Sequence, residues 1–184
     1  MCPSCGYFAG DISEGDERIR AVVDSDIYQA QFKDPQRPSR MQLGALLVDP
    51  RDEYCLEERC YWNLWGAWTS KSGDAVVLSR RLAMAALGRV IEAGSQYFEM
   101  AGKDLVVMAD LHRRCGEFDE AAEWVSRGLA CDCDKEARRQ LALEQSFIKA
   151  RDTGPHDKWD KPVEPPQETP ETPALSAFDG KAPL

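Results

Sequence analysis

The sequence predicts an all-α protein, and three observations support this fold class. Through most of residues 17–150, apolar side chains recur at the i, i+3, i+4, i+7 spacing of one helix face. No segment alternates polar and apolar residues with the period of two that a half-buried strand shows. Ser, Asp, Pro and Gly residues, which begin or end helices, separate the apolar-patterned segments. We therefore expect a stack of antiparallel helices.

The first expected helices are bounded by capping residues and prolines. Ser25 is the expected N-cap of a helix that ends before Pro35, and a second helix begins near Pro38. Pro50 is expected at the first position of a third helix, which ends at Gly73.

The third expected helix carries an aromatic stripe. Tyr61, Leu64, Trp65 and Trp68 stand at positions i, i+3, i+4 and i+7, so we expect them to share one face and pack in the core. Trp62 falls on another side of the helix, where it is expected to line a surface groove.

The next segments continue the stack. One long helix is expected from its N-cap Asp74 to Gly102. Two shorter amphipathic helices follow, separated by a tight turn at residues 115–118. Gly116 is expected to end the first helix of this pair in the left-handed conformation, and Asp119 to cap the second.

The spacing of this helical pair resembles a tetratricopeptide repeat. The matching positions are Leu105, Ala109, His112, Gly116, Phe118, Ala121, Val125 and Leu129. A single repeat cannot bury its faces alone, so flanking helices at 82–101 and 135–151 are expected to complete the stack. The resemblance implies that the first helix of the pair lines a concave face that binds a protein or peptide partner. The expected partner-binding residues are Lys103, Val106, Asp110, Arg113 and Arg114.

The stretch CPSCGY at residues 2–7 has the form of a metal-binding knuckle. Cys2 and Cys5 supply two thiolates at C-x-x-C spacing, and the glycine that follows lets backbone N–H groups fold over them. A structural zinc ion takes four ligands, so zinc is a candidate cofactor only if two more ligands are found. The candidates for them are, first, Cys55 and Cys60 and, second, Cys131 and Cys133. The alternative is a half-site of reduced, metal-free thiols.

Four segments follow one another in a recognisable order: CPSCGY, VVDSDIYQAQF, CYWNLWGAW and DLHRRCGEFDEAAEW. Together, over roughly residues 2–150, they resemble a bacterial family of uncharacterised proteins, domain-of-unknown-function family twenty-two twenty-five. The resemblance implies a tetratricopeptide-like fold in a cytosolic protein, and it implies no activity. Members of this family carry an earlier Cys pair upstream of the knuckle, which is missing here. The resemblance therefore implies that the other ligands are lost, are replaced by Cys55 and Cys60, or come from another chain.

From residue 151 onward the composition changes. This segment holds seven of the eleven prolines and carries four basic residues against seven acidic ones. Because it can bury little apolar surface, we expect an extended, polyproline-like tail that could lie across the basic end of the partner-binding face. The expected organisation is a Cys knuckle at 1–16, a helical domain at 17–150 and a flexible tail at 151–184.

Bulk composition narrows the class of partner. The 184 residues include 23 Lys plus Arg and 32 Asp plus Glu, and the net charge of −9 repels nucleic acid and anionic membranes. No apolar stretch approaches the ~20 residues of a membrane-spanning helix, and early acidic residues interrupt any signal-peptide pattern. We expect a cytoplasmic protein whose seven cysteines are thiols or metal ligands, with a homo-oligomer as an option.

The leading functional hypothesis is a non-catalytic protein-interaction module, because the sequence has no nucleophile–base pair and no paired carboxylates in a catalytic pattern. One alternative is a thiol- or metal-dependent enzyme that uses Cys2 and Cys5. A second alternative is a nucleic-acid binder that combines the knuckle with a basic patch. That patch would consist of Arg18, Arg20, Arg37 and Arg40.

Overall fold

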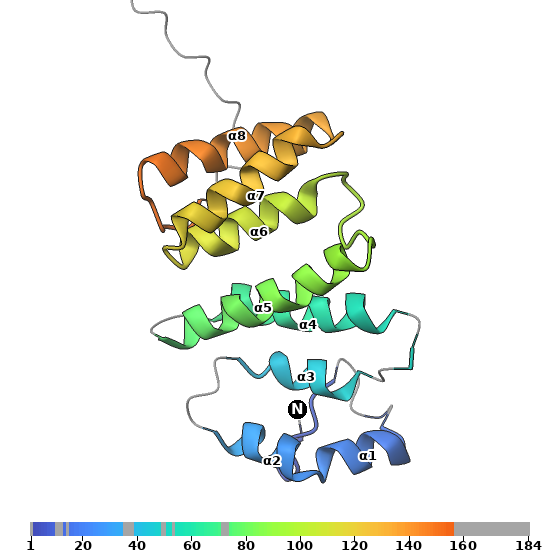
Figure 1. Ribbon diagram of the computed structural model, residues 1–184. Helices are drawn as coiled ribbons and strands as arrows, with labels where there is room; N and C mark the ends of the chain where they lie inside the picture. The colour runs from blue at the N-terminus through green and yellow to red at the C-terminus, as the bar shows by residue number, and fades with distance from the viewer. Residues whose placement is uncertain are drawn as a thin grey trace, which may run out of the picture.

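The computed structural model of the chain is built from stacked helices (Figure 1). The structure describes residues 2–9, 13, 15–34, 39–48, 51–52, 54–70 and 74–156. These residues form eight α-helices and no strand, which confirms the all-α class for the described part of the chain. The helices are α1 (Glu17–Val23), α2 (Asp26–Lys33), α3 (Gln42–Leu47), α4 (Cys55–Thr69), α5 (Asp74–Glu92), α6 (Lys103–Arg114), α7 (Phe118–Ala130) and α8 (Lys135–Lys149).

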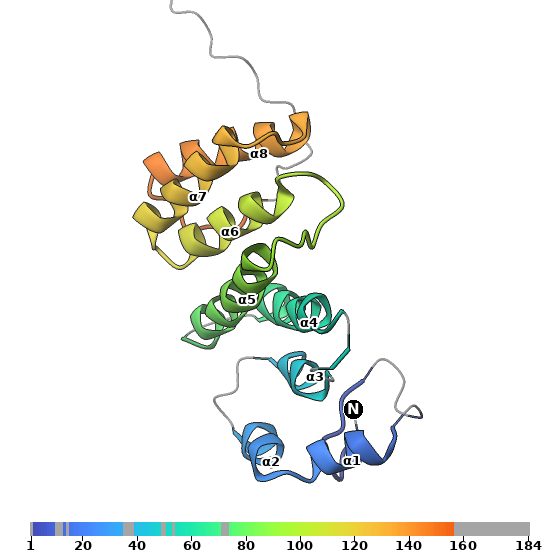
Figure 2. The same cartoon turned by 45° about the vertical axis from the view of Figure 1, so that its right-hand side comes forward.

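The helices follow one another through the stack in chain order (Figures 1 and 2). The N-terminal residues, α1 and α2 form one end, and α3 lies between them and the paired helices α4 and α5. The pair α6 and α7 comes next, and α8 packs on both of these helices at the other end. None of the helices in the described part is both long enough and apolar enough to pass through a bilayer.

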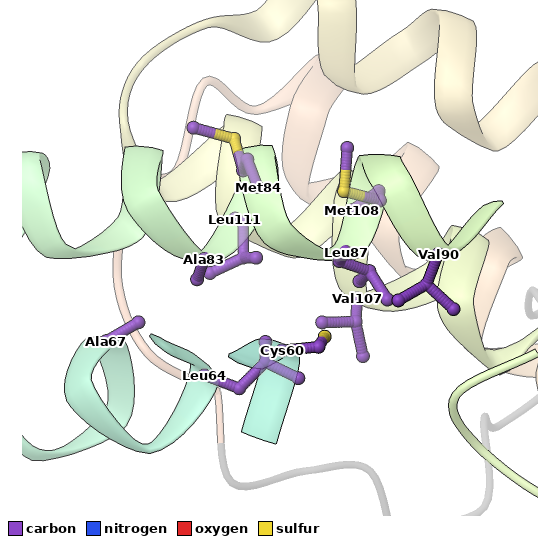
Figure 3. Close-up of a cluster of buried hydrophobic side chains, with 10 residues drawn as sticks. All are labelled: Cys60, Leu64, Ala67, Ala83, Met84, Leu87, Val90, Val107, Met108 and Leu111. Atoms are coloured by element: carbon purple, nitrogen blue, oxygen red, sulfur yellow. The ribbon is translucent and has the colours of Figure 1, made fainter. Parts of the chain in front are cut away.

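Three clusters of buried apolar side chains hold the layers together. The first joins the N-terminal residues to α1, α2 and α3 and includes the fully buried Tyr28 and Leu43. The second joins α4, α5 and α6, where Cys60, Leu64 and Ala67 of α4 face side chains of the other two helices (Figure 3). The third joins α6, α7 and α8. The stack therefore has a chain of small cores instead of a single large one.

Two of the expected helix ends are confirmed. The Ser25 hydroxyl accepts a hydrogen bond from the Tyr28 backbone N–H at 3.3 Å, so Ser25 is the N-cap of α2. Gly116 has φ +79° and follows Cys115, the C-cap of α6, and the N–H of Glu117 donates to the His112 carbonyl at 3.0 Å across it. The chain reverses at this point, and α7 packs back along α6 (Figure 1).

The expectation that one helix runs from Asp74 to Gly102 is wrong, because α5 ends at Glu92. Gly94 has φ +72°, and the Ser95 N–H donates to the Val90 carbonyl at 3.1 Å, which is the hydrogen-bond pattern that closes a helix C-terminus.

The segment after α5 is held by a side chain of the following helix. The Asp104 carboxylate, which is buried, accepts hydrogen bonds from the backbone N–H groups of Tyr97 at 2.9 Å and Phe98 at 3.0 Å. These N–H groups are therefore satisfied without a helix, and the two aromatic rings pack against the α4–α5–α6 core from a loop.

Two other expected helix starts shift. The third expected helix begins at Cys55, and Pro50 lies outside the described residues, as do Pro35 and Pro38. The N-cap of α7 is Glu117 and makes no side-chain capping bond, so the prediction of Asp119 as the cap is wrong. Asp119 lies in the first turn of α7, where its charge still favours the positive end of the helix dipole.

Candidate functional site

The aromatic side chains of α4 lie on its exposed side. Tyr61, Trp65 and Trp68 are 42%, 41% and 45% exposed, so the prediction that they pack in the core is wrong. The core stripe of α4 consists instead of Cys60, Leu64 and Ala67. We call the exposed set, Tyr61, Trp65 and Trp68, the aromatic face.

Trp62 is also placed differently from the prediction. Its ring lies against the backbone of Gly44, where an added Cβ would come within 2.4 Å of a ring atom, and it meets the Phe8 ring edge-to-face at 5.6 Å. Trp62 therefore joins α4 to α3 and to the N-terminal residues. Only Leu64 of the expected apolar stripe is buried in the core as predicted.

The rings of the aromatic face contact one another along the helix. The centroids of Tyr61 and Trp65 lie 6.1 Å apart, and those of Trp65 and Trp68 lie 6.0 Å apart with the planes at 72°. These are favourable ring geometries, so the three partly exposed side chains also support one another. The result is a continuous row of aromatic rings at the surface of α4.

The aromatic face leads into a cavity of about 370 Å³. Trp68 forms part of one wall, and Phe98 and Val107 extend the apolar lining. The polar lining consists of three residues of α6, Lys103, Asp110 and Arg114, and the segment after α8 contributes Pro155 and His156. Three of the five residues predicted to bind a partner therefore surround this cavity.

The other two predicted partner-binding residues are buried by the chain itself. Val106 packs in the core between α6, α7 and α8, and Arg113 has no exposed surface. Val106 and Arg113 therefore do not present surface to a partner, because α8 and residues 152–154 cover these two positions.

Arg113 is the centre of a buried hydrogen-bond network. Its guanidinium donates to the carboxylates of Glu144 at 2.6 Å and Asp110 at 2.7 Å. It also donates to the backbone carbonyls of Asp152 at 2.6 Å and Gly154 at 3.0 Å. Arg113 thus fixes the segment that follows α8 onto α6, and so positions one wall of the cavity.

The charges around this network are perturbed by burial. Burial raises the pKa of Glu144 to about 7, the nearby Asp110 carboxylate adds to the rise, and Arg113 opposes it. Burial also lowers the pKa of Lys103, whose ammonium group donates to Gln140 Oε1 at 2.6 Å. Lys103 and Arg114 keep the cavity positive on balance, with Asp110 as its acidic partner.

The Cys knuckle folds as a tight turn against α2. Gly6 has φ +79°, its N–H donates to the Cys2 carbonyl at 3.0 Å, and the Cys2 N–H donates to the Tyr7 carbonyl at 2.8 Å. The Tyr28 hydroxyl and the Gln29 amide hold the turn from α2 by donating to the carbonyls of residues 6 and 5.

The turn also activates one thiol. The Ser4 hydroxyl, followed by the backbone N–H groups of Cys5 and Ser4, lowers the pKa of Cys2 to about 6. At neutral pH most of Cys2 is therefore thiolate, the form that binds metals and attacks electrophiles.

The described chain does not bring four metal ligands together. Cys2 and Cys5 pack beside the N-terminal core, whereas Cys60 is fully buried in the core of α4, α5 and α6, where burial raises its pKa to about 12. Within the described residues, no group of three or more Cys, His, Asp or Glu side chains could hold a metal ion. In the described residues, Cys2 and Cys5 therefore do not lie in one group with Cys55 and Cys60.

The remaining candidates occupy separate places. The His112 Nδ1 atom shares a hydrogen bond with Glu117 Oε2 at 2.8 Å, and the His112 ring stacks on Trp124. His112 is therefore a packed residue. Arg18, one member of the proposed basic patch, donates to the Leu47 carbonyl at 2.8 Å, and Arg37 lies outside the described residues.

A larger cavity of about 840 Å³ lies between the knuckle and α1. Its charged lining is Asp16, Glu17, Arg20 and Asp24, and Asp16 is already engaged as the N-cap of α1. Its lining has no counterpart to Trp68 or to the two cations, Lys103 and Arg114, that line the smaller cavity. The surface around Trp68 is therefore the stronger candidate for a binding site.

The aromatic face was missed because α4 is apolar on nearly every side. In CYWNLWGAW, residues 60–68, Cys60, Leu64 and Ala67 form a stripe as regular as that of Tyr61, Trp65 and Trp68. Periodicity cannot decide which of two adjacent stripes is buried.

Comparison with known proteins finds no family model, no curated protein and no solved structure that matches this chain.

Proposed function

We propose that the protein is a non-catalytic protein-interaction module that binds a peptide or protein segment on the aromatic face and the adjoining cavity. The observation that carries this proposal is the row of Tyr61, Trp65 and Trp68, which stay exposed while touching one another and end at a cavity lined by Lys103 and Arg114. Rigid aromatic anchors beside basic side chains are the usual centre of protein interfaces.

The size of the surface suits a peptide partner. Three aromatic side chains at these exposures offer about 200–300 Å² of largely apolar area. At about 25 cal/mol per Å², covering it supplies about 5–7 kcal/mol before the entropy cost of association. The cavity adds polar contacts that fix orientation, because Lys103, Asp110 and Arg114 present both signs of charge.

We further propose that the helices form a tetratricopeptide-like scaffold, as in the family that the sequence resembles. In support, α6 and α7 form a tight helical hairpin, α4 and α5 form another pair, and α8 covers the end of the stack. The small residues Ala121 and Gly128 are buried where α7 approaches its neighbours. In such a scaffold α4 and α6, the first helices of their pairs, would present the binding face.

The test compares partner capture by three forms of the full chain. Trp65→Ser/Trp68→Ser removes the aromatic face, and Leu78→Ser is the matched control because Leu78 is an exposed apolar residue on α5. Both changes affect exposed side chains, and circular dichroism verifies the fold. We expect proteins captured by the wild type and by Leu78→Ser to be lost with the double variant. Capture that is identical for all three forms would contradict the proposal.

A second candidate function is thiol chemistry at Cys2, and the lowered pKa of this thiol favours it. Rates of native alkylation by iodoacetamide between pH 5 and 9 test this candidate. An accessible Cys2 thiolate predicts fast modification at Cys2 with a midpoint near pH 6. Equally slow alkylation of all seven cysteines would dismiss it.

A further inference from the structure

We propose that residues 157–173 of this chain occupy the aromatic face in cis, as an extended polyproline-type ligand that an outside partner must displace. The inference rests on the proposed function, since it assigns an occupant to the same surface. It starts from two facts, the point at which the described chain ends and the sequence that follows that point.

The described chain ends at the site. Arg113 ties the carbonyls of Asp152 and Gly154 down onto α6, and the His156 ring stacks on Phe147 with a centroid distance of 3.8 Å. His156 and the proline before it line the same cavity as Trp68. The last described residue, His156, therefore lies at the cavity.

The sequence that follows has the pattern that aromatic grooves recognise. Residues 157–184 lie outside the described residues, and within them PVEP at 162–165 and PETP at 170–173 each repeat the spacing Pro-x-x-Pro. Such segments favour the polyproline helix before binding, so little entropy is lost when they dock on exposed Trp and Tyr rings.

The lengths match. The five residues 157–161 span at most about 17 Å, which is enough to leave the cavity that Trp68 helps to line. A Pro-x-x-Pro unit extends about 9 Å at 3.1 Å per residue. Along α4, Tyr61 and Trp68 are separated by about 10 Å at 1.5 Å per residue. One such unit can therefore cover the whole aromatic face.

The charges match as well. Residues 157–173, the proposed occupant, carry five acidic side chains and two lysines. The cavity from which they would emerge is lined by Lys103 and Arg114 against the single acid Asp110. The tail therefore brings net negative charge to a site with net positive charge.

Tethering makes even a weak contact effective. A tether as short as five residues, the number between His156 and the first Pro-x-x-Pro unit, gives an effective concentration of about 1 mM. A tail segment with an intrinsic Kd of about 0.1 mM would then occupy the face in roughly ten molecules out of eleven. The apparent affinity for an outside partner would fall about tenfold, because only the open form binds it.

The experiment uses the full chain labelled with 5-fluorotryptophan and read by ¹⁹F NMR. Single Trp→Phe variants assign the resonances of the five tryptophans. The test variant replaces Pro162, Pro165, Pro170 and Pro173 with Ser, which leaves every described residue unchanged. We expect the Trp65 and Trp68 resonances to shift in this variant, and that of Trp124, which lies on α7 under Arg127, to stay in place.

Each outcome decides the inference. A shift of the Trp65 and Trp68 resonances that is independent of protein concentration supports docking in cis. Unchanged resonances overturn it. A shift that appears only as concentration rises also overturns it, because the tail of a second copy would then be the occupant.

A second measurement separates this inference from the proposed function. A synthetic peptide of residues 157–175 is titrated into the wild type and into the four-proline variant. Binding to the variant that is about tenfold tighter than to the wild type supports tail docking. Equal binding to both forms overturns tail docking but leaves the aromatic face as a peptide site. No binding to either form overturns tail docking, and the capture experiment then decides the proposed function separately.

Discussion

Replacement of Arg113 by Met tests whether the buried network holds the C-terminal layers together. The change removes four hydrogen bonds, two to carboxylates and two to backbone carbonyls, from a side chain with no exposed surface. It also leaves Glu144, which is fully buried, without its cationic partner. Removal of one member of a buried pair costs about 3–5 kcal/mol, because the other charge stays desolvated.

Urea denaturation followed by far-ultraviolet circular dichroism measures this loss. With an m-value of about 2 kcal/mol per M, a loss of about 4 kcal/mol moves the midpoint down by about 2 M. The matched control is Arg81→Met, since Arg81 is 62% exposed and pairs with Glu117 only at the surface. That control is expected to lose less than about 1 kcal/mol.

A second variant checks the cause. Arg113→Met combined with Glu144→Leu removes both charges, and we expect it to be more stable than Arg113→Met alone. A loss below about 1 kcal/mol for Arg113→Met, or no recovery in the double variant, would refute the reasoning that the cost comes from an uncompensated buried charge.

Three further predictions follow. Burial raises the pKa of Glu144 to about 7 in the folded state, so the folded state binds this proton more tightly than the unfolded chain does. The free energy of unfolding should therefore fall as pH rises from about 4.5 to 7, and Glu144→Gln should flatten this slope in urea titrations. An unchanged slope would exclude Glu144 as its source. Trp62→Ala should lower the free energy of unfolding by about 2–4 kcal/mol, whereas Trp65→Ala should cost less than about 1 kcal/mol, and the reverse order would mean that Trp65 is the packed residue. If the purified chain carries zinc, Cys2→Ser should remove it and Cys60→Ala should leave the metal content unchanged, so loss of zinc with Cys60→Ala would place that thiol in the site.

Most local features of the fold could be predicted from the sequence, because they depend on residues near each other in the chain. The all-α class follows from helical periodicity, the start of α2 from the hydroxyl of Ser25, and the reversal after α6 from Gly116, which adopts positive φ without strain. Gly94 is a similar local signal for the end of α5. The apolar residues Tyr97 and Phe98 continue the helical spacing beyond it, so the sequence predicted a longer helix.

The candidate site depended on tertiary packing, which periodicity does not encode. Both stripes of α4 are apolar, and the position of α5 and α6 determines that Cys60 and Leu64 are buried while Trp65 is exposed. In the same way, Arg113 and Arg114 are adjacent basic residues of α6, and Arg113 is buried because Glu144 on α8 and the backbone carbonyls of Asp152 and Gly154 accept its hydrogen bonds. The sequence by itself therefore determined the all-α class, the start of α2 and the reversal after α6, because capping and backbone preferences act over a few residues. The tertiary structure alone decided which faces are covered, because burial depends on elements that are distant in the chain.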